Sequence, residues 1–439
     1  MKSHSRRGLR FGSLFLAMVL VLAACDSGES TDTTTAGTGG EASGEPVELL
    51  VWASRDWYAP PDNYDAFNER HEGEIHVTLD VQANDDILQQ LQRMQDADQP
   101  MPDLVQDDTF LIEAYNAAGL VMPFDEQMAT WEEEDPEEFA NILPIAWEEN
   151  VLDGQTLGSS LTANFDILYY NVPWFEEAGF DPSTIDSLDG VLEALRAAQA
   201  ARPDGIPLTV QALPTTGVTL LKTFFSAAGA PFEGATPDLQ SPGGIYTLEW
   251  FLTAAEEGLM PADAISWDED QARGVFLAQD AAMILDGFTV AGDLSEEPGF
   301  DYETVWNVIP VPASQTGAQQ DGNQISNART WFLTSGTEHP YEAGLAMRYV
   351  NETLVDQAAN GSVPMRNSRH LEDPRLDEIW PFFTDQLREA YAGSASVPAA
   401  LNGGDVEAIL EQLFGEIVVG TDKTAQELAD EYQPQLDEL

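Results

Sequence analysis

Positively charged residues are scarce in this sequence. Its 439 residues include 18 Lys and Arg against 77 Asp and Glu, which gives a formal net charge of −59 at pH 7. A surface this acidic repels nucleic acid and other polyanions, so no nucleic-acid partner is expected. Repulsion among the carboxylates also opposes compaction at low ionic strength, and salt relieves it. Both a salt-adapted host and an acidic secreted protein without that adaptation fit this composition.

Cysteine is almost absent, and so are the common catalytic motifs. Cys25 is the single cysteine, so the folded part cannot rely on a disulfide and depends on its core alone. The histidines lack His-Glu-x-x-His spacing, and the chain has neither a Gly-x-Ser-x-Gly nucleophile nor a phosphate-cradling glycine loop. "DEDQARGVF" departs from the calcium-loop pattern at its later ligands. We therefore expect no metal, no cofactor and no enzymatic activity.

The first 24 residues have the layout of a signal peptide. A basic start, with Lys2, Arg6, Arg7 and Arg10, precedes the uncharged apolar run "FGSLFLAMVLVLAA". Fourteen residues are too few to span a bilayer but suit the apolar region of a signal peptide. Residues 1–24 are therefore expected to be a leader that export removes.

The end of this leader, "LAAC" (Leu22 to Cys25), resembles the lipobox of bacterial lipoproteins. In such proteins the Cys is acylated and becomes the new N-terminus, and two or more acyl chains hold a protein stably on a membrane. The alternative is an ordinary secretory signal beside a stray Cys. Residues 26–45 are rich in Gly, Ser, Thr and Glu, so we expect 25–45 to be a flexible linker. The expected location is extracytoplasmic, anchored by lipid to the outer face of the cell membrane.

The residues from Pro46 onward have the pattern of an α/β protein. Strands are predicted at "VELLVWAS" (47–54), "IHVTLDV" (75–81) and "PDLVQDD" (102–108), with a helix after each. Alternating strands and helices imply a parallel sheet, whose ligands lie at the carboxyl ends of the strands. Nearly four hundred residues also suggest two domains.

The second part of the chain has a different pattern. An extended run at 157–171 is followed by helices, and Ser266 with Glu269 forms a predicted capping box at one helix start. Strands are predicted at "AAMILDGF", "VWNVIPVP" and "ARTWFLTSG". The tail is predicted to be three helices: "DEIWPFFTDQLREAY", "DVEAILEQLFGEIVVG" and "TAQELADEYQPQLDEL".

Several of these segments, in this order, resemble the extracellular solute-binding proteins of ABC importers, specifically the carbohydrate-binding kind akin to maltodextrin-binding proteins. The segments that carry the resemblance are "LLVWAS", "PDLVQDDTFLIEAYNAAGLVMPFDE", "TLGSSLTANFDILYYNVPWFEEAGFD", "FLAQDAAMILDGF" and "GSVPMRNS". Two departures concern the ligand: Gly287, Phe288 and Thr289 stand where the family often has Gly-Pro-Trp, and "SSLTAN" lacks a common Pro.

The resemblance implies a periplasmic-binding-protein-like fold, in which two α/β lobes joined by a hinge of several segments hold a ligand between them. The N-terminal lobe would comprise residues 46–158 and 305–351, and the C-terminal lobe residues 159–304 and 352–439. The implied function is capture of a sugar or oligosaccharide by lobe closure and its delivery to the permease of an ABC importer. We expect the protein to act as a monomer and to touch the membrane only through its lipid anchor.

Candidate ligand-binding residues follow the first predicted strand. Sugar sites combine flat aromatic faces, which cover the C–H faces of the ring, with planar polar groups that bond pairs of hydroxyls. Trp52, Arg55, Asp56 and Trp57 supply both kinds of group within six residues. Aromatic residues at such strand ends often cover the core instead.

Other candidates lie at later strand ends. Asp107 and Asp108 end the third strand, and we expect one to cap the next helix and Asp107 to face the cleft. Asn164 and Asp166 lie in the predicted hinge run, where they either reach ligand hydroxyls or form a turn.

Trp267 precedes a helix, as a stacking platform or as an apolar staple residue. Asp286 and Arg366 match family positions, the first of which contacts sugar. Arg329 and Trp331 flank the strand that returns to the N-terminal lobe. Structural pairing with the many carboxylates is the alternative for each arginine.

Two other functions are compatible with these residues. An exported glycoside hydrolase needs two carboxylates, for which Asp107 and Asp286 are candidates. The same fold could instead bind a polyamine or a quaternary ammonium through cation–π contacts, although the arginines argue against a cation and suit an acidic sugar.

Overall fold

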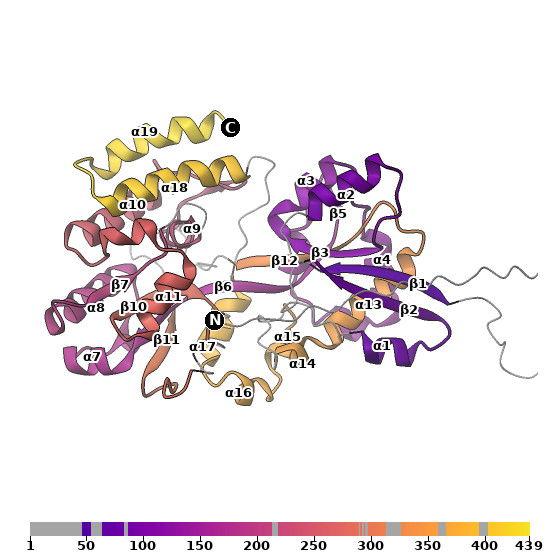
Figure 1. Cartoon of the computed structure of the whole chain (residues 1–439), viewed down its shortest axis with the longest axis horizontal. Helices are drawn as coiled ribbons and strands as arrows, with labels where there is room; N and C mark the ends of the chain where they lie inside the picture. Colours follow the sequence, from indigo (N-terminus) through magenta and orange to yellow (C-terminus); the bar gives the residue numbers. More distant parts are fainter. Residues whose placement is uncertain are drawn as a thin grey trace, which may run out of the picture. The chain divides into compact units, whose positions relative to one another are not determined.

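The computed structural model describes residues 46–53, 64–82, 87–212, 218–288, 290–291, 294, 297–312, 326–358, 366–394 and 403–439 (Figure 1). The predicted leader, Cys25 and the linker lie outside these residues. No helix among the described residues has the length and apolar character needed to cross a membrane.

The strands within the described residues form one large sheet and two short hairpins. The large sheet has the order β2-β1-β3-β12-β6-β10-β7, and β11 pairs with β6 off this path. β1 is parallel to both β2 and β3, which confirms the parallel sheet predicted for the first part of the chain. The strands are β1 (Val47–Ala53), β2 (Ile75–Val81), β3 (Leu104–Asp108), β4 (Val151–Leu152), β5 (Gln155–Thr156), β6 (Ser159–Asn171), β7 (Ile206–Thr209), β8 (Phe232–Glu233), β9 (Thr236–Pro237), β10 (Ala281–Gly287), β11 (Trp306–Pro310) and β12 (Ser326–Leu333).

Helices connect these strands and follow them. The α-helices are α1 (Asp65–Arg70), α2 (Ile87–Asp96), α3 (Ile112–Ala117), α4 (Asp125–Glu134), α5 (Pro136–Phe139), α6 (Ile145–Glu148), α7 (Val172–Ala178), α8 (Leu188–Ala201), α9 (Val218–Ala227), α10 (Pro242–Glu256), α11 (Glu269–Leu277), α13 (Pro340–Glu352), α14 (Leu354–Ala358), α15 (Ser368–Leu371), α16 (Leu376–Ile379), α17 (Asp385–Ala392), α18 (Gly403–Val419) and α19 (Ala425–Asp437). Short 3₁₀ helices are η1 (Thr109–Leu111), η2 (Pro182–Thr184) and η3 (Ala262–Ser266).

The long strand β6 is shared by two groups of strands. Its first half, up to Phe165, pairs with β12, and its second half, from Asp166 on, pairs with β10 and β11. Figure 1 shows β6 running from the strands around β3 into the strands around β10. The predicted extended run is therefore confirmed as one strand, and its pairing partner changes between residues 165 and 166.

Two predicted helix features are wrong. The capping box at α11 is formed by Asp268 and Gln271, because Ser266 ends η3 and donates its hydroxyl to the carbonyl of Asp263. The predicted tail helix "DEIWPFFTDQLREAY" is two helices, α16 and α17. Pro381 stands two residues after the end of α16, where its ring and missing N–H cannot continue a helix.

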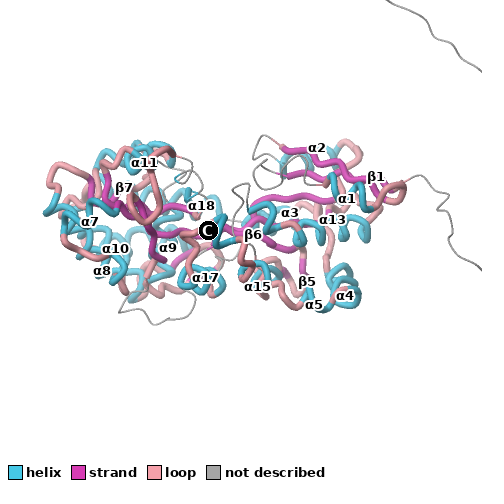
Figure 2. The backbone as a smooth tube through the Cα atoms, turned by 90° about the horizontal axis from the view of Figure 1, so that it is seen from below, coloured by secondary structure: helices cyan, strands magenta, loops and turns pink. Residues whose placement is uncertain are grey.

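Buried side chains form separate apolar clusters. One cluster joins β1, β2 and β12 to α1, α13, β10 and the segment from α14 to α17. A second joins the second half of β6 to α7, α8, α9, α10, α18 and α19, and Figure 2 shows α7, α8 and α10 around β7. A smaller third cluster packs α2 and α3 against β1 and β3. Each Å² of apolar surface removed from water contributes about 25 cal/mol to the stability of the fold. These clusters therefore stabilise the fold without a disulfide.

Candidate functional site

Asp107 and Asp108, the last two residues of β3, have different surroundings. Burial raises the pKa of Asp107 to about 6, and its carboxylate accepts bonds from the Tyr115 hydroxyl and the Asp108 amide. Asp108 stands at the N-cap position of η1, although its side chain makes no capping bond. Asp108 instead pairs with Arg329 of β12. The carboxylate that pairs with Arg329 is that of Asp108, and the orientation of Asp107 toward a cleft stays a prediction.

Trp331 lies on the same face of the sheet as Arg329, two residues farther along β12. It is fully buried, and in register it stands between Gln106 of β3 and Ser159 of β6. Directly opposed residues in antiparallel strands point to one face of the sheet. The strands therefore bring Arg329 and Trp331 together with Gln106 and Ser159, neither of which was predicted as a site residue.

A second group of polar side chains gathers at the end of β10. Arg273 of α11 holds both carboxylate oxygens of Asp286, with Nε at 2.7 Å and Nη2 at 2.9 Å, and also pairs with Glu269. This bidentate arrangement fixes the direction of the Asp286 carboxylate. We did not select Arg273 as a site residue from the sequence, although it is one of few basic residues and lies four positions after Glu269 on one helix face.

The two predicted residues of β6 lie beside this group. The Asn164 side-chain oxygen accepts a bond of 2.8 Å from the Phe288 amide, and Asp166 accepts one of 2.7 Å from the Thr223 hydroxyl. Burial, reinforced by the charge of Asp286, raises the pKa of Asp166 to about 7. Asn164 belongs to the half of β6 that pairs with β12, yet it bonds the turn after β10. It therefore ties the two halves of the sheet together at the point where β6 changes partner.

Other predicted residues lie apart from both groups. Trp52 is buried in the cluster beneath α2 and α3. Trp267 follows η3 and is half-buried against the second apolar cluster. Arg366 is buried in an ion pair with Glu149, which is the structural pairing considered for each arginine. Arg55, Asp56 and Trp57 lie outside the described residues.

Phe110 is an aromatic residue that sequence reasoning missed. It belongs to η1, directly after the end of β3, and 44% of its surface is exposed. An exposed ring at the carboxyl end of a parallel strand is well placed to stack on a ligand. Its position two residues after Asp108 could have indicated this role, but from the sequence we considered only the two carboxylates at this strand end.

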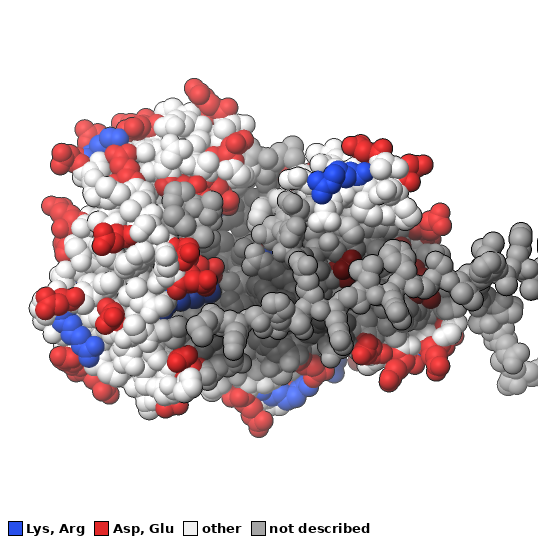
Figure 3. Space-filling model, viewed as in Figure 1, with Lys and Arg blue, Asp and Glu red and all other residues white. Residues whose placement is uncertain are grey.

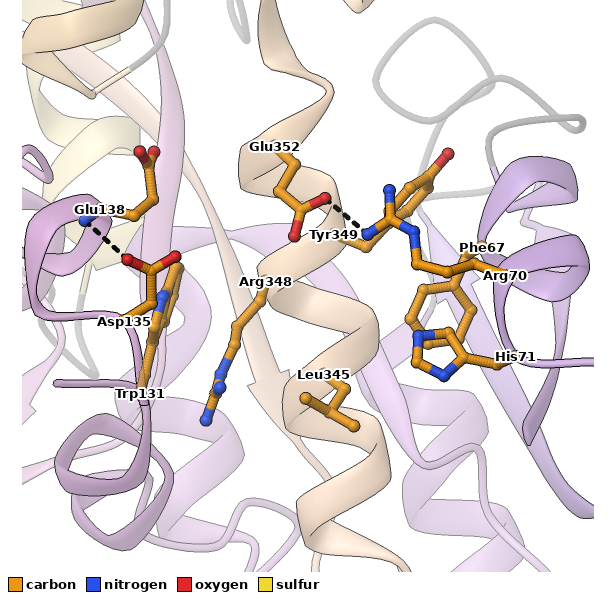
Figure 4. Close-up of a pocket in the computed structure, with 10 residues that line it drawn as sticks. All are labelled: Phe67, Arg70, His71, Trp131, Asp135, Glu138, Leu345, Arg348, Tyr349 and Glu352. Atoms are coloured by element: carbon orange, nitrogen blue, oxygen red, sulfur yellow. Dashed lines mark hydrogen bonds and ion pairs between the residues drawn. The ribbon is translucent and has the colours of Figure 1, made fainter. Parts of the chain in front are cut away.

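A separate pocket lies between α1, α13 and the α4–α5 region. Figure 4 shows the lining side chains, which are Phe67, Arg70, His71, Trp131, Asp135, Glu138, Leu345, Arg348, Tyr349 and Glu352. Both guanidinium groups are engaged, Arg70 with Glu352 and Arg348 with Glu134, and each lies over an aromatic ring. None of the predicted ligand-binding residues lines this pocket.

Charge on the described surface drawn in Figure 3 is unevenly distributed between the two signs, as it is in the sequence. On the face drawn in Figure 3, acidic side chains are spread over the molecule and basic side chains are few. Within the described parts of the chain, no cluster of three or more His, Cys, Asp or Glu side chains has the arrangement to hold a metal ion.

The chain is a mixed α/β protein in which one long strand serves two groups of strands, and it has the periplasmic-binding-protein-like fold that the resemblance implies. The model of the bacterial extracellular solute-binding protein family matches residues 56–353, so the chain belongs to this family. The resemblance noted from the sequence is thereby confirmed.

Relatives and solved structures agree with this membership. The xylose/arabinose-binding protein XacG of Haloferax volcanii is 27% identical over 234 residues; the match covers 51% of this chain and 48% of the relative, so the two share about half their lengths. The cyclic alpha-maltosyl-1,6-maltose binding protein from Arthrobacter globiformis superposes with a TM-score of 0.75 at 15% identity, over 90% of this chain and 98% of that one. The sugar-binding protein MalE from Xanthomonas citri has a TM-score of 0.73 at 17% identity, over 89% and 98% of the two chains. At these identities the solved structures establish a common fold.

Proposed function

We propose that this protein is the substrate-binding lipoprotein of an ABC importer, which captures a sugar or oligosaccharide and delivers it to a membrane permease. Membership of the solute-binding family carries the proposal. The sugar is supported by a relative named for xylose and arabinose and by the polar groups at the ends of β3 and β10.

Lobe closure about β6 is the proposed mechanism of capture. The N-terminal lobe comprises residues 46–158 and most of 305–351, and the C-terminal lobe residues 159–304 and 352–439. β11 pairs with the same half of β6 as β10, so we assign its residues, 306–310, to the C-terminal lobe instead. A ligand that bonds to both halves of the sheet binds the closed form more tightly and so shifts the hinge equilibrium toward it.

Asp286 is the side chain best prepared to bind a sugar hydroxyl. Arg273 holds its carboxylate in one orientation, and the Gly287 amide donates to the same carboxylate at 2.7 Å. A hydrogen bond to a charged group contributes about 1.5–3 kcal/mol, more than a bond between neutral groups. Phe110 and Arg329 would supply the apolar face and the second charged group from the other side of the hinge.

A thermal-shift panel of neutral oligosaccharides, pentoses, uronates and polyamines tests the ligand class. A ligand at a hundred times its dissociation constant adds about 2.7 kcal/mol to the free energy of unfolding. Asp286→Asn should lose most of the shift caused by the binding sugar, whereas the exposed control Asp377→Asn should keep it. Stabilisation by a polyamine and by no sugar would overturn the sugar assignment, and release of sugar products would identify a hydrolase.

Two further measurements test closure and anchoring. Small-angle scattering should report compaction when the binding sugar is added, and an unchanged radius of gyration would contradict capture by closure. Cys25→Ser should release the protein from the membrane fraction into the medium, because the lipid could no longer be attached. Retention of this variant on the membrane would contradict the anchor.

A further inference from the structure

The strands β3, β12 and β6 hold a row of buried polar side chains, each with an atom for which the described residues supply no hydrogen-bond partner. Trp331 pairs in register with Gln106 on one side and with Ser159 on the other. All three are at most 1% exposed. Trp331 Nε1, Gln106 Oε1 and Ser159 Oγ have no hydrogen-bond partner among the described residues. Cβ atoms of directly opposed residues lie about 4.5–5.5 Å apart, so these side chains are neighbours on one face.

The next row on the same face is also polar. Arg329 pairs in register with Asp108 and with Thr162, and its guanidinium forms an ion pair with Asp108. Thr162 is buried, and its hydroxyl too has no hydrogen-bond partner in the part of the chain that the structure describes. Four polar atoms without a partner among the described residues therefore belong to two rows beside a charged pair, and the pairing of β12 with β6 is irregular between these rows.

The chemistry of these atoms defines what can satisfy them. Buried polar atoms in proteins are nearly always hydrogen bonded, so a cluster of unused ones calls for a partner. The indole N–H of Trp331 only donates, the amide oxygen of Gln106 only accepts, and the hydroxyl of Ser159 does both. A group that serves all three must accept one bond and donate another. A carboxylate cannot donate and an ammonium cannot accept, whereas a neutral hydroxyl does both.

We propose that the row formed by Gln106, Trp331 and Ser159 binds a neutral hydroxyl group. The hydroxyl comes either from a captured sugar, in which case the inference rests on the proposed function, or from an internal water molecule that bridges the three side chains. A water held by two to four polar partners is a normal part of a protein interior. In both cases Trp331 acts as a hydrogen-bond donor, which differs from the stacking role expected of aromatic residues in a sugar site.

Ser159 and Ser160 provide a matched pair of variants for the test. Both are fully buried and adjacent in β6, but the Ser160 hydroxyl has visible partners in Thr109 and Asn150, both at 2.9 Å. Ser159→Ala and Gln106→Met would be compared with Ser160→Ala by urea unfolding and by calorimetric titration with arabinose and maltose. A buried polar atom without a hydrogen-bond partner lowers the free energy of unfolding, so its removal is neutral or stabilising. Removal of a side chain that bonds a bound hydroxyl lowers the free energy of unfolding instead.

The proposal is supported, with water as the source of the hydroxyl, if Ser159→Ala and Gln106→Met unfold at lower urea concentrations than the wild type in the absence of sugar. The decrease should be similar to that of Ser160→Ala. Unchanged midpoints with a tenfold or greater loss of affinity for a probe sugar support the proposal with sugar as the source. The proposal is overturned if both variants unfold at or above the midpoint of the wild type and their affinity for the probe sugars is unchanged. It is also overturned if their midpoints are not lowered and the wild type binds neither probe sugar. Failure of both sugars to bind the wild-type protein counts against the proposed ligand class, while the midpoints still decide whether the row holds water.

Discussion

Replacing Glu149 by Gln tests the buried ion pair between Glu149 and Arg366. The side chains are 3% and 1% exposed, and the Tyr391 hydroxyl also contacts the Arg366 guanidinium. The backbone holds Arg366 in place through bonds of 2.7 Å to the Leu161 carbonyl and 2.9 Å from the Leu143 amide. The guanidinium therefore cannot move to solvent easily when its carboxylate partner is removed.

Loss of one partner of a buried pair leaves an uncompensated charge and destabilises a protein by about 3–5 kcal/mol. We expect this loss for Glu149→Gln in urea unfolding of the chain from residue 26 onward at fixed salt. Asp356→Asn is the control, because Asp356 and its partner Arg375 are 69% and 55% exposed. Exposed pairs contribute about 0–1 kcal/mol.

Two results would refute this reasoning. The first is a loss for Glu149→Gln no larger than that for Asp356→Asn. The second concerns the double variant Glu149→Leu with Arg366→Met, which removes both charges and should recover most of the stability lost in Glu149→Gln. A double variant less stable than Glu149→Gln would mean that the attraction within the pair, and not the cost of an unpaired charge, accounts for the loss of stability.

Three further predictions follow from charge and close contacts. Because burial raises the pKa of Asp166 from 3.8 to about 7, the folded state retains a proton that the unfolded state releases, so stability falls as the pH rises through this window. Asp166→Asn should remove that part of the slope in urea unfolding, and equal slopes in both proteins would contradict the assignment. A Cβ on Gly287 would lie 2.2 Å from Asn164 Nδ2, so Gly287→Ala should displace Asn164 from the Phe288 amide and weaken sugar binding. Asn164→Ala should then add little to Gly287→Ala in a double-mutant cycle, and simple additivity would argue against the contact. With a net charge of −59, the urea midpoint should rise as KCl is raised from about 0.1 to 1 M, which shortens the screening length from about 10 to 3 Å; a flat midpoint would show that surface repulsion is negligible.

Local patterns predicted most of the elements near the site. The parallel strands β1, β2 and β3 and the long strand β6 were predicted because apolar runs and alternation reflect burial directly. The capping box at α11 was missed because both Ser266 and Asp268 can cap a helix, and only the extent of η3 decides between them. The segment "DEIWPFFTDQLREAY" was predicted as one helix, although it contains Pro381, which a helix interior does not accommodate.

The site was harder to predict because its partners are distant in sequence. Arg366 meets Glu149 across 217 positions, and no local pattern distinguishes such a pair from an arginine that faces a ligand. Which of Asp107 and Asp108 faces Arg329 depends on the strand register between β3 and β12. The row of Gln106, Trp331 and Ser159 is likewise created by register, because it joins residues from three separate strands.

The position of α18 and α19 has a consequence for the order in which the chain can fold. Their apolar residues complete the cluster around α9 and α10, and Gln433 accepts a bond of 2.7 Å from the Leu239 amide, 194 positions earlier. Until α18 and α19 have left the ribosome, their apolar residues cannot cover α9 and α10. The cluster around α9 and α10 therefore cannot reach its final packing before residues 403–439 have been synthesised.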